Sequence, residues 1–275
     1  MIKLGMFTVS TQDWEPLEAI EKLAALGFDG VELRMREPTP NGNPPIDIGA
    51  DELISRADEI KAKAADCGVE LPSLASYVRN TDMDASIKAL EACAAIGAKC
   101  VRIGAGGYGI DDDAWQATLD AKARYALLAE KAAELGVKAV METHHGTINP
   151  TTLASRFILE GIDPAHAGIM WDPANQGREG LDRYHMAVSM AGPYLAEVHV
   201  KNVLYTSSIE EDGRTDWKAG WAPLKDGMVN WPQVVNILKK ADYDGWLIFE
   251  YLGGKQLPDQ QFKDDLAWFR ELVAS

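Results

Sequence analysis

Eight strand-like runs alternate with helix-like runs along this chain, and the alternation limits the possible folds more than any other feature. The strand-like runs are short and apolar, whereas the helix-like runs repeat apolar residues at helical spacing. Strict alternation of the two is typical of βα units, which build parallel sheets. The predicted strands cover residues 2–8, 28–34, 69–76, 99–104, 137–146, 167–172, 195–201 and 246–250.

Residues that start and stop helices lie between these strands. Asp13 and Asn230 precede helical runs as candidate N-caps, each with a proline in the turn that follows. Gly27 and Gly136 follow the last turn of their runs, where a left-handed backbone ends a helix. The predicted helices cover residues 15–26, 51–67, 82–96, 112–135, 182–190, 231–240 and 258–273, and a short helix starts at 149–150.

A single closed barrel accounts for this pattern. The chain has 275 residues, an ordinary length for an α/β fold of the (β/α)8 type. No change of composition and no low-complexity linker divides it, so residues 1–275 are expected to form one domain. The alternative is an open, doubly wound sheet, but no glycine-rich phosphate-binding turn follows the first strand.

Charge and composition exclude several classes of partner. The formal charge is −15 at pH 7, which leaves no basic surface for a nucleic acid or an anionic membrane. Cys67, Cys93 and Cys100 are odd in number and lie in apolar runs, so we expect free thiols in a reducing compartment. No apolar run reaches the roughly 18 residues of a membrane span, and the first residues lead directly into a strand. These features predict a cytoplasmic protein.

Polar residues stand at the ends of four successive predicted strands. They are Glu142, Asp172, His199 and Glu250. Their separations match one βα repeat each, with an excursion after the seventh strand. Because the carboxyl ends of barrel strands meet at one face, we expect the four side chains to converge there.

Three converging carboxylates need a cation, because like charges raise one another's pKa. A divalent metal satisfies this need, and a set of three oxygens and one nitrogen suits Mn²⁺, Mg²⁺ or Co²⁺, with Zn²⁺ as a further candidate. The alternative is that each of the four is an ordinary polar residue at the rim.

Several motifs resemble those of a known family. The segments METHHG, WDPAN, EVHVKN and LIFEYLG are similar to the sugar phosphate isomerase/epimerase superfamily, whose xylose isomerase-like TIM barrels include ketose 3-epimerases. The resemblance extends over nearly the whole chain. It implies that Glu142, Asp172, His199 and Glu250 hold one divalent ion, usually Mn²⁺. It also implies that Glu142 and Glu250 act as the acid and base on either side of a metal-bound enediolate.

The chain departs from the ketose epimerase pattern at two places. Asn175 stands where those enzymes commonly carry a substrate-binding histidine, and it is therefore a candidate substrate-binding residue. No arginine closely follows His199. The chain also carries His144 two residues after Glu142. His144 should share a strand face with Glu142 and is a candidate catalytic base. His145 should point toward the helices.

Further residues are candidates for substrate binding. Lys201 shares a face with His199 and would donate to a substrate oxygen, or else extend into water from the rim. Glu32 and Arg102 would bind sugar hydroxyls or pair internally. Trp14, like the aromatic residues of the 203–229 segment, would stack on a sugar ring or an aryl aglycone, or form a subunit contact.

These features leave several functions open. The first is a metal-dependent isomerase or epimerase of a sugar or sugar-like polyol. The second is a lyase that cleaves a 3-oxo-glycoside by β-elimination, with a dehydratase as a variant. A DNA-repair endonuclease would need more histidines than the chain's five and a basic groove. A non-catalytic subunit would not need four intact ligands. The expected partner is a small carbohydrate, and both a homo-oligomer and a complex with a second subunit remain open.

Overall fold

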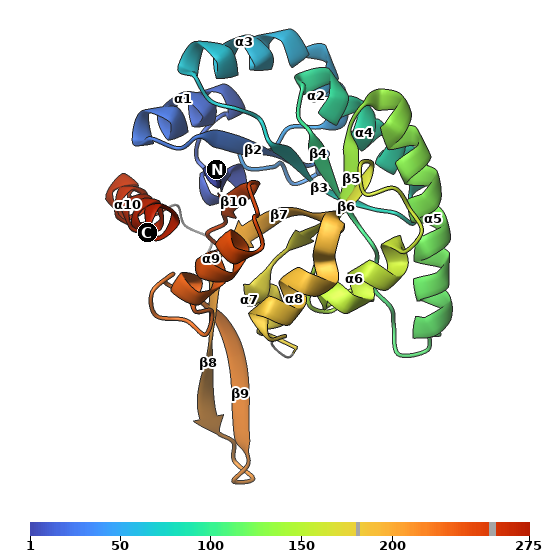
Figure 1. Cartoon of the computed structure of the whole chain (residues 1–275), viewed down its shortest axis with the longest axis vertical. Coiled ribbons are helices and arrows are strands. Elements are labelled where there is room, and N and C mark those ends of the chain that lie inside the picture. The colour runs from blue at the N-terminus through green and yellow to red at the C-terminus, as the bar shows by residue number, and fades with distance from the viewer. Residues whose placement is uncertain (180–181, 253–256) are drawn as a thin grey trace.

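Eight parallel strands close into a barrel in this computed structural model, which describes residues 1–179, 182–252 and 257–275 (Figure 1). The predicted (β/α)8 barrel is therefore confirmed, and the alternative of an open sheet is wrong. Going round the barrel, the strand order is β1, β10, β7, β6, β5, β4, β3, β2. The strands are β1 (Lys3–Phe7), β2 (Gly30–Met35), β3 (Ser73–Arg79), β4 (Cys100–Gly104), β5 (Lys138–Glu142), β6 (Ala167–Trp171), β7 (Leu195–Val200) and β10 (Trp246–Phe249).

Helices cover the outside of the barrel. Side chains of Asp113, Thr151 and Asn230 cap helix N-termini, and Gly27 ends α1 in a left-handed conformation. The helices are α1 (Pro16–Leu26), α2 (Ala50–Ser55), α3 (Ala57–Cys67), α4 (Met83–Ile96), α5 (Ala114–Leu135), α6 (Thr152–Leu159), α7 (Pro173–Gln176), α8 (Tyr184–Ala191), α9 (Trp231–Lys240) and α10 (Asp259–Ala274). The helix predicted over 51–67 is interrupted at Arg56, which separates α2 from α3.

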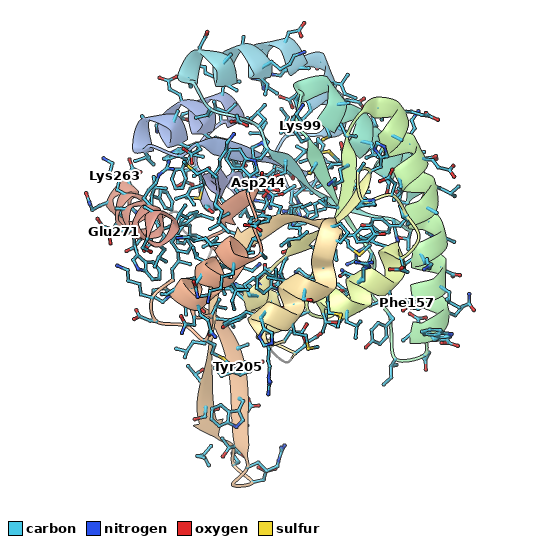
Figure 2. The ribbon with its side chains drawn as sticks, viewed as in Figure 1. Lys99, Phe157, Tyr205, Asp244, Lys263 and Glu271 are labelled. Atoms are coloured by element: carbon cyan, nitrogen blue, oxygen red, sulfur yellow. The ribbon has the colours of Figure 1, made fainter. Side chains whose placement is uncertain are left out.

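The hydrophobic core lies between the barrel and these helices. On α10, Phe262 and Phe269 are buried, while Lys263 and Glu271 project from the outer face (Figure 2). The strands themselves are apolar on the side that faces the helices and are buried on both sides, as expected for a parallel barrel. Within the described residues, no helix combines the length and apolar character that crossing a membrane requires.

An antiparallel hairpin projects from the barrel between β7 and α9 (Figure 1). It consists of β8 (Asn202–Ile209) and β9 (Thr215–Ala222), in a segment that the sequence predicts only as a long connection. In an antiparallel pair, directly opposite residues share a face. Pairing of Val203 with Trp221, and of Tyr205 with Ala219, therefore places apolar side chains on one face of the hairpin.

Candidate active site

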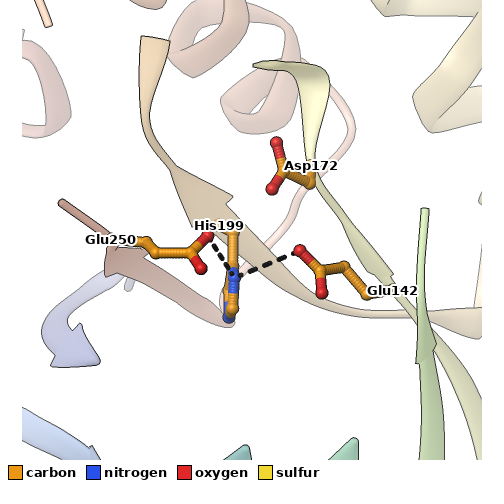
Figure 3. A group of neighbouring side chains, drawn as sticks. All are labelled: Glu142, Asp172, His199 and Glu250. Carbon is orange, nitrogen blue, oxygen red and sulfur yellow. Dashed lines mark hydrogen bonds and ion pairs between the residues drawn. The ribbon is translucent and has the colours of Figure 1, made fainter. Parts of the chain in front are cut away.

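The four predicted ligands meet at the carboxyl ends of neighbouring strands. Glu142 ends β5, Asp172 follows β6, His199 lies near the end of β7 and Glu250 follows β10. One ligand atom from each residue lies within 4.8 Å of the other three, and all four residues are buried. In Figure 3, Glu142 and Glu250 approach His199 from opposite sides. Their carboxylate oxygens lie 3.7 and 3.2 Å from His199 Nδ1.

The three carboxylates of the cluster surround the ammonium group of a buried lysine. Lys201 Nζ lies 2.6 Å from Glu250 Oε2, 2.7 Å from Asp172 Oδ2 and 3.7 Å from Glu142 Oε1. The lysine therefore faces the barrel interior as predicted, with its ammonium among the three carboxylates. Burial opposes its charge, but the neighbouring carboxylates outweigh burial and raise the pKa of Lys201. The surroundings thus stabilise a cation at the carboxylate cluster. Three carboxylates and one imidazole nitrogen form a donor set that fits a hard or borderline divalent metal ion.

Arg102 on β4 holds Glu142 from the other side. Its Nη1 lies 2.7 Å from Glu142 Oε2, and its Nε donates to the carbonyl oxygen of Ser76 at 3.1 Å. Burial raises the pKa of Glu142, but the positive charges of Arg102 and Lys201 reverse this and lower it overall. Glu250 is similar, since Lys201 and His199 overcome burial and lower its pKa to about 2. Both glutamates are therefore ionised in this arrangement.

Asn175 connects two of the ligands. Its side-chain amide donates to Glu142 Oε1 at 2.9 Å and to Asp172 Oδ2 at 2.8 Å, and its backbone N–H donates to Asp172 Oδ1. Asp172 also caps α7, which fixes the position of its carboxylate. Asn175 is fully buried, so the structure places it as a support for the ligands, whereas the sequence predicts a substrate contact.

A chain of hydrogen bonds supports His199 beneath the site. Its Nε2 donates to Glu32 Oε2 at 3.0 Å. Ser73 Oγ lies 2.9 Å from Glu32 Oε1 and 2.8 Å from Glu197 Oε1. A hydroxyl has only one hydrogen to donate, so the second bond needs a proton on one of these carboxyls. Burial and the nearby charge of Glu32 raise the pKa of Glu197 to about 8, which identifies Glu197 as the protonated partner.

Of the two alternatives predicted for Glu32, this geometry supports internal pairing and not the binding of sugar hydroxyls. Glu32 is fully buried, and both of its oxygens are bonded within the protein. Its carboxylate fixes the ring of His199 so that Nδ1 points toward the other ligands. Such carboxylate–histidine pairs are common behind metal ligands.

His144 and His145 stack on each other at the mouth of the barrel, with ring centroids 4.3 Å apart. His144 lines the cavity as predicted, and its Nδ1 lies 2.7 Å from the carbonyl oxygen of His145. A carbonyl only accepts hydrogen bonds, so Nδ1 carries the hydrogen and Nε2 of the neutral ring keeps a lone pair. His145 does not line the cavity, and its Nδ1 lies 3.2 Å from Oδ1 of Asn175 on the short helix α7.

A cavity of about 420 Å³ opens above the ligands. Glu142, Glu250, Lys201 and Arg102 line it together with His144 and several less polar residues, namely Tyr77, Val78, Ala105, Trp221 and Leu252. Sequence reasoning missed Tyr77 because it ended the third strand at residue 76, whereas β3 continues to Arg79. The signal in the sequence was an aromatic residue directly after the predicted end of the third strand.

The prediction that Trp14 binds substrate is also corrected. Trp14 is buried, with Lys22 Nζ 4.6 Å from its ring centroid, and it does not line the described cavity. It follows the short 3-10 turn after β1 and packs into the core. Trp221 on β9 lines the cavity, as one of the alternatives for the 203–229 segment predicts.

Comparison with known proteins finds similarity to a dehydratase and to two epimerases. The inosose dehydratase of Geobacillus thermodenitrificans is 26% identical over 145 residues, which are 50% of this chain and 47% of that protein. The 3-keto-D-glucoside 4-epimerase of E. coli superposes with a TM-score of 0.75 at 18% identity, covering 98% of this chain and all of the other. A D-psicose 3-epimerase superposes with a TM-score of 0.73 at 16% identity and covers both chains fully.

The structural matches have low sequence identity and establish the fold alone. The match to the dehydratase spans about half the length of each protein. A family model described as xylose isomerase-like TIM barrel matches residues 20–272 of this chain. Nearly the whole chain is covered, including all four predicted ligands. The chain therefore belongs to the xylose isomerase-like TIM barrel family.

Proposed function

We propose that this protein is a divalent-metal-dependent isomerase or epimerase that acts on a sugar or a sugar-like polyol. One observation carries the proposal: Glu142 and Glu250 flank His199 from opposite sides and both line the cavity (Figure 3). A carbon bound between them presents one face to each carboxylate. The relatives that act as epimerases and dehydratases support this class of chemistry.

The two glutamates divide the proton transfer between them. An ionised glutamate removes the proton from the carbon next to a substrate carbonyl, and the electron pair moves into an enediolate. The opposite glutamate, which must first take up a proton from solvent, gives that proton to the other face, which inverts the carbon. Arg102 and Lys201 favour the ionised forms and so favour proton removal. Lys201 also lines the cavity, where its ammonium would stabilise the negative oxygen of the enediolate.

Glu142, Asp172, His199 and Glu250 would hold the metal ion. When bound, the ion supplies Lewis acidity that polarises the substrate carbonyl. His199 would bind through Nδ1, since Nε2 is engaged by Glu32.

Proton exchange with solvent tests this proposal. A panel of ketoses and 3-oxo sugars is incubated with Mn²⁺-loaded protein in D₂O, and deuterium at the carbon next to the carbonyl is measured by NMR. We expect deuterium in substrate and product, about one bound metal ion per chain, and loss of both metal and exchange in Glu142→Gln. Full activity after complete removal of metal would contradict the proposal.

A second function, β-elimination by a lyase, is favoured by His144. Its Nε2 keeps a lone pair and its ring lines the cavity. Asn175, by contrast, donates its side-chain hydrogens to the carboxylates of Glu142 and Asp172. On a 3-oxo-glycoside, the base removes the C2 proton, the electron pair forms the C1–C2 double bond, and the aglycone leaves C1 with its bonding pair and takes up a proton.

Aglycone release separates the two functions. With 3-oxo-glycosides as substrates, a lyase releases free aglycone and leaves an unsaturated sugar, whereas an epimerase leaves the glycosidic bond intact. For the lyase we expect His144→Ala to lower the release rate by about 100-fold or more, the usual contribution of a general base. His145→Ala is the neighbouring control and should retain most of the rate. An unchanged rate in His144→Ala would eliminate His144 as the base.

A further inference from the structure

The cavity changes in character from its base to its mouth. At its base are the carboxylates of Glu142 and Glu250, both buried, with the ammonium of Lys201 beside them. Nearer to solvent lie Tyr77, which is 49% exposed, and the half-buried ring of Trp221. Two aromatic walls at the mouth, apart from the carboxylates at the base, can stack on a ring other than the sugar ring that reacts.

The two aromatic residues come from opposite sides of the barrel. Tyr77 lies on β3, and Trp221 lies at the base of the hairpin that directly follows β7. In the order of the eight strands, β3 and β7 are as far apart as the closed barrel allows. Because both residues line one cavity, the cavity lies between them.

Cations fix both rings in place. Arg102 and Arg34 lie 4.9 and 5.3 Å from the ring centroid of Tyr77, and Arg34 is itself paired with the buried Asp47. Lys201 Nζ lies 4.9 Å from the ring centroid of Trp221. Cation–π contacts of this kind stabilise the position of an aromatic ring even where it is solvent-exposed. The two walls are therefore largely pre-organised, which reduces the entropy lost on binding.

We propose that Tyr77 and Trp221 hold a second, ring-shaped group of the substrate between them, so that the site takes aryl or similarly flat glycosides in preference to free monosaccharides. The inference rests on the proposed function, because it places the reacting sugar at Glu142 and Glu250. The size of the cavity is compatible with this, since about 420 Å³ falls within the range of roughly 300–1,000 Å³ typical of pockets for drug-sized ligands. Apolar Leu252 lines the same cavity.

Binding without turnover tests this inference. Methyl and phenyl glycosides of the same hexoses and the same anomeric configuration are titrated into metal-loaded protein by calorimetry. We expect phenyl glycosides to bind about tenfold more tightly than methyl glycosides, as two aromatic contacts would provide. Trp221→Ala and Tyr77→Ala should each lower this ratio about threefold or more while leaving methyl glycoside binding nearly unchanged.

Two variants serve as controls. Trp217→Ala removes a tryptophan that is 62% exposed on the same hairpin but does not line the described cavity, so the phenyl-to-methyl ratio should stay as in the wild type. Tyr77→Phe keeps the ring and should keep the ratio, and thermal unfolding of every variant reports whether it folds. Equal affinity for the two glycosides in the wild type, or no phenyl glycoside binding at millimolar concentration, would overturn the inference. A retained ratio in Trp221→Ala would do the same.

This test is independent of the reaction. If phenyl glycosides bind preferentially and no proton exchange or aglycone release occurs, the proposed function fails and the inference stands. If free sugars are epimerised and the phenyl group gives no advantage, the proposed function stands and the inference fails.

Discussion

Glu32 lies deep in the barrel, where it supports His199 and has no access to the cavity. It accepts a hydrogen bond from His199 Nε2 at 3.0 Å and leaves Nδ1 facing the other ligands. The variant Glu32→Gln retains the shape but loses the charge that favours this orientation. We expect its affinity for Mn²⁺ to fall by about 10- to 100-fold, the usual effect of removing such a support. Competition with a fluorescent chelator measures the change.

A surface glutamate provides the matched control for this variant. Glu70 is exposed and pairs with Lys3 far from the ligands. Glu70→Gln should bind Mn²⁺ as the wild type does. If Glu32→Gln also binds with wild-type affinity, the hydrogen bond to Glu32 does not orient His199.

At the scale of elements, the hairpin of β8 and β9 divides into a supporting base and a free end. At the base, Tyr205 donates to the carbonyl oxygen of Arg178 at 2.7 Å and Trp221 lines the cavity. At the free end, Ile209 is 72% exposed and Trp217 is 62% exposed. The end beyond Tyr205 and its partner Ala219 therefore contributes little to burial.

Truncation of the hairpin tests this division. Residues 206–218 are replaced by Asn-Gly, a two-residue turn that suits the paired ends Tyr205 and Ala219. We expect the free energy of unfolding to change by less than about 0.5 kcal/mol, because exposed positions contribute little. By contrast, Tyr205→Phe in the full chain should cost about 1 kcal/mol through its lost hydrogen bond. Urea titration compares them, and a large loss on truncation would show that the free end packs against the barrel.

The sequence predicts correctly those elements whose signals lie within short stretches of the chain. All eight barrel strands are confirmed because each is a compact apolar run between capped helices. The convergence of Glu142, Asp172, His199 and Glu250 is confirmed because strand ends share one face of the barrel. The hairpin was missed, since Thr206, Ser207 and Ser208 give it no strand-like alternation of apolar and polar residues.

The errors within the site arise from tertiary structure. Glu32 and Lys201 both stand near strand ends, yet only Lys201 lines the cavity, because residues at different levels of the barrel interior face different neighbours. Trp14 lies where the chain has already left a strand, so strand periodicity does not determine its direction. No local pattern specifies these positions.

At the scale of the whole molecule, stability should depend on pH through the buried Glu197. Its pKa is raised by burial and by the charge of Glu32 to about 8, from an ordinary value of 4.5. Between these two pH values the native state retains a proton that the unfolded state has lost. The contribution of Glu197 to stability is therefore fully present below about pH 4.5 and declines as the pH rises toward 8.

The variant Glu197→Gln should remove this part of the pH dependence. An uncharged amide keeps the donor that the protonated carboxyl offers to Ser73 Oγ, which lies 2.8 Å from Glu197 Oε1. At pH 8 we expect the variant to be more stable than the wild type by at least about 1 kcal/mol, since one pKa unit corresponds to 1.36 kcal/mol. Near pH 5 the difference should largely vanish. Urea unfolding across this range in EDTA measures both, with exposed Glu91→Gln as the control. Parallel curves for Glu197→Gln and the wild type would show that Glu197 is ionised in the native protein and that another group supplies the second hydrogen bond to Ser73.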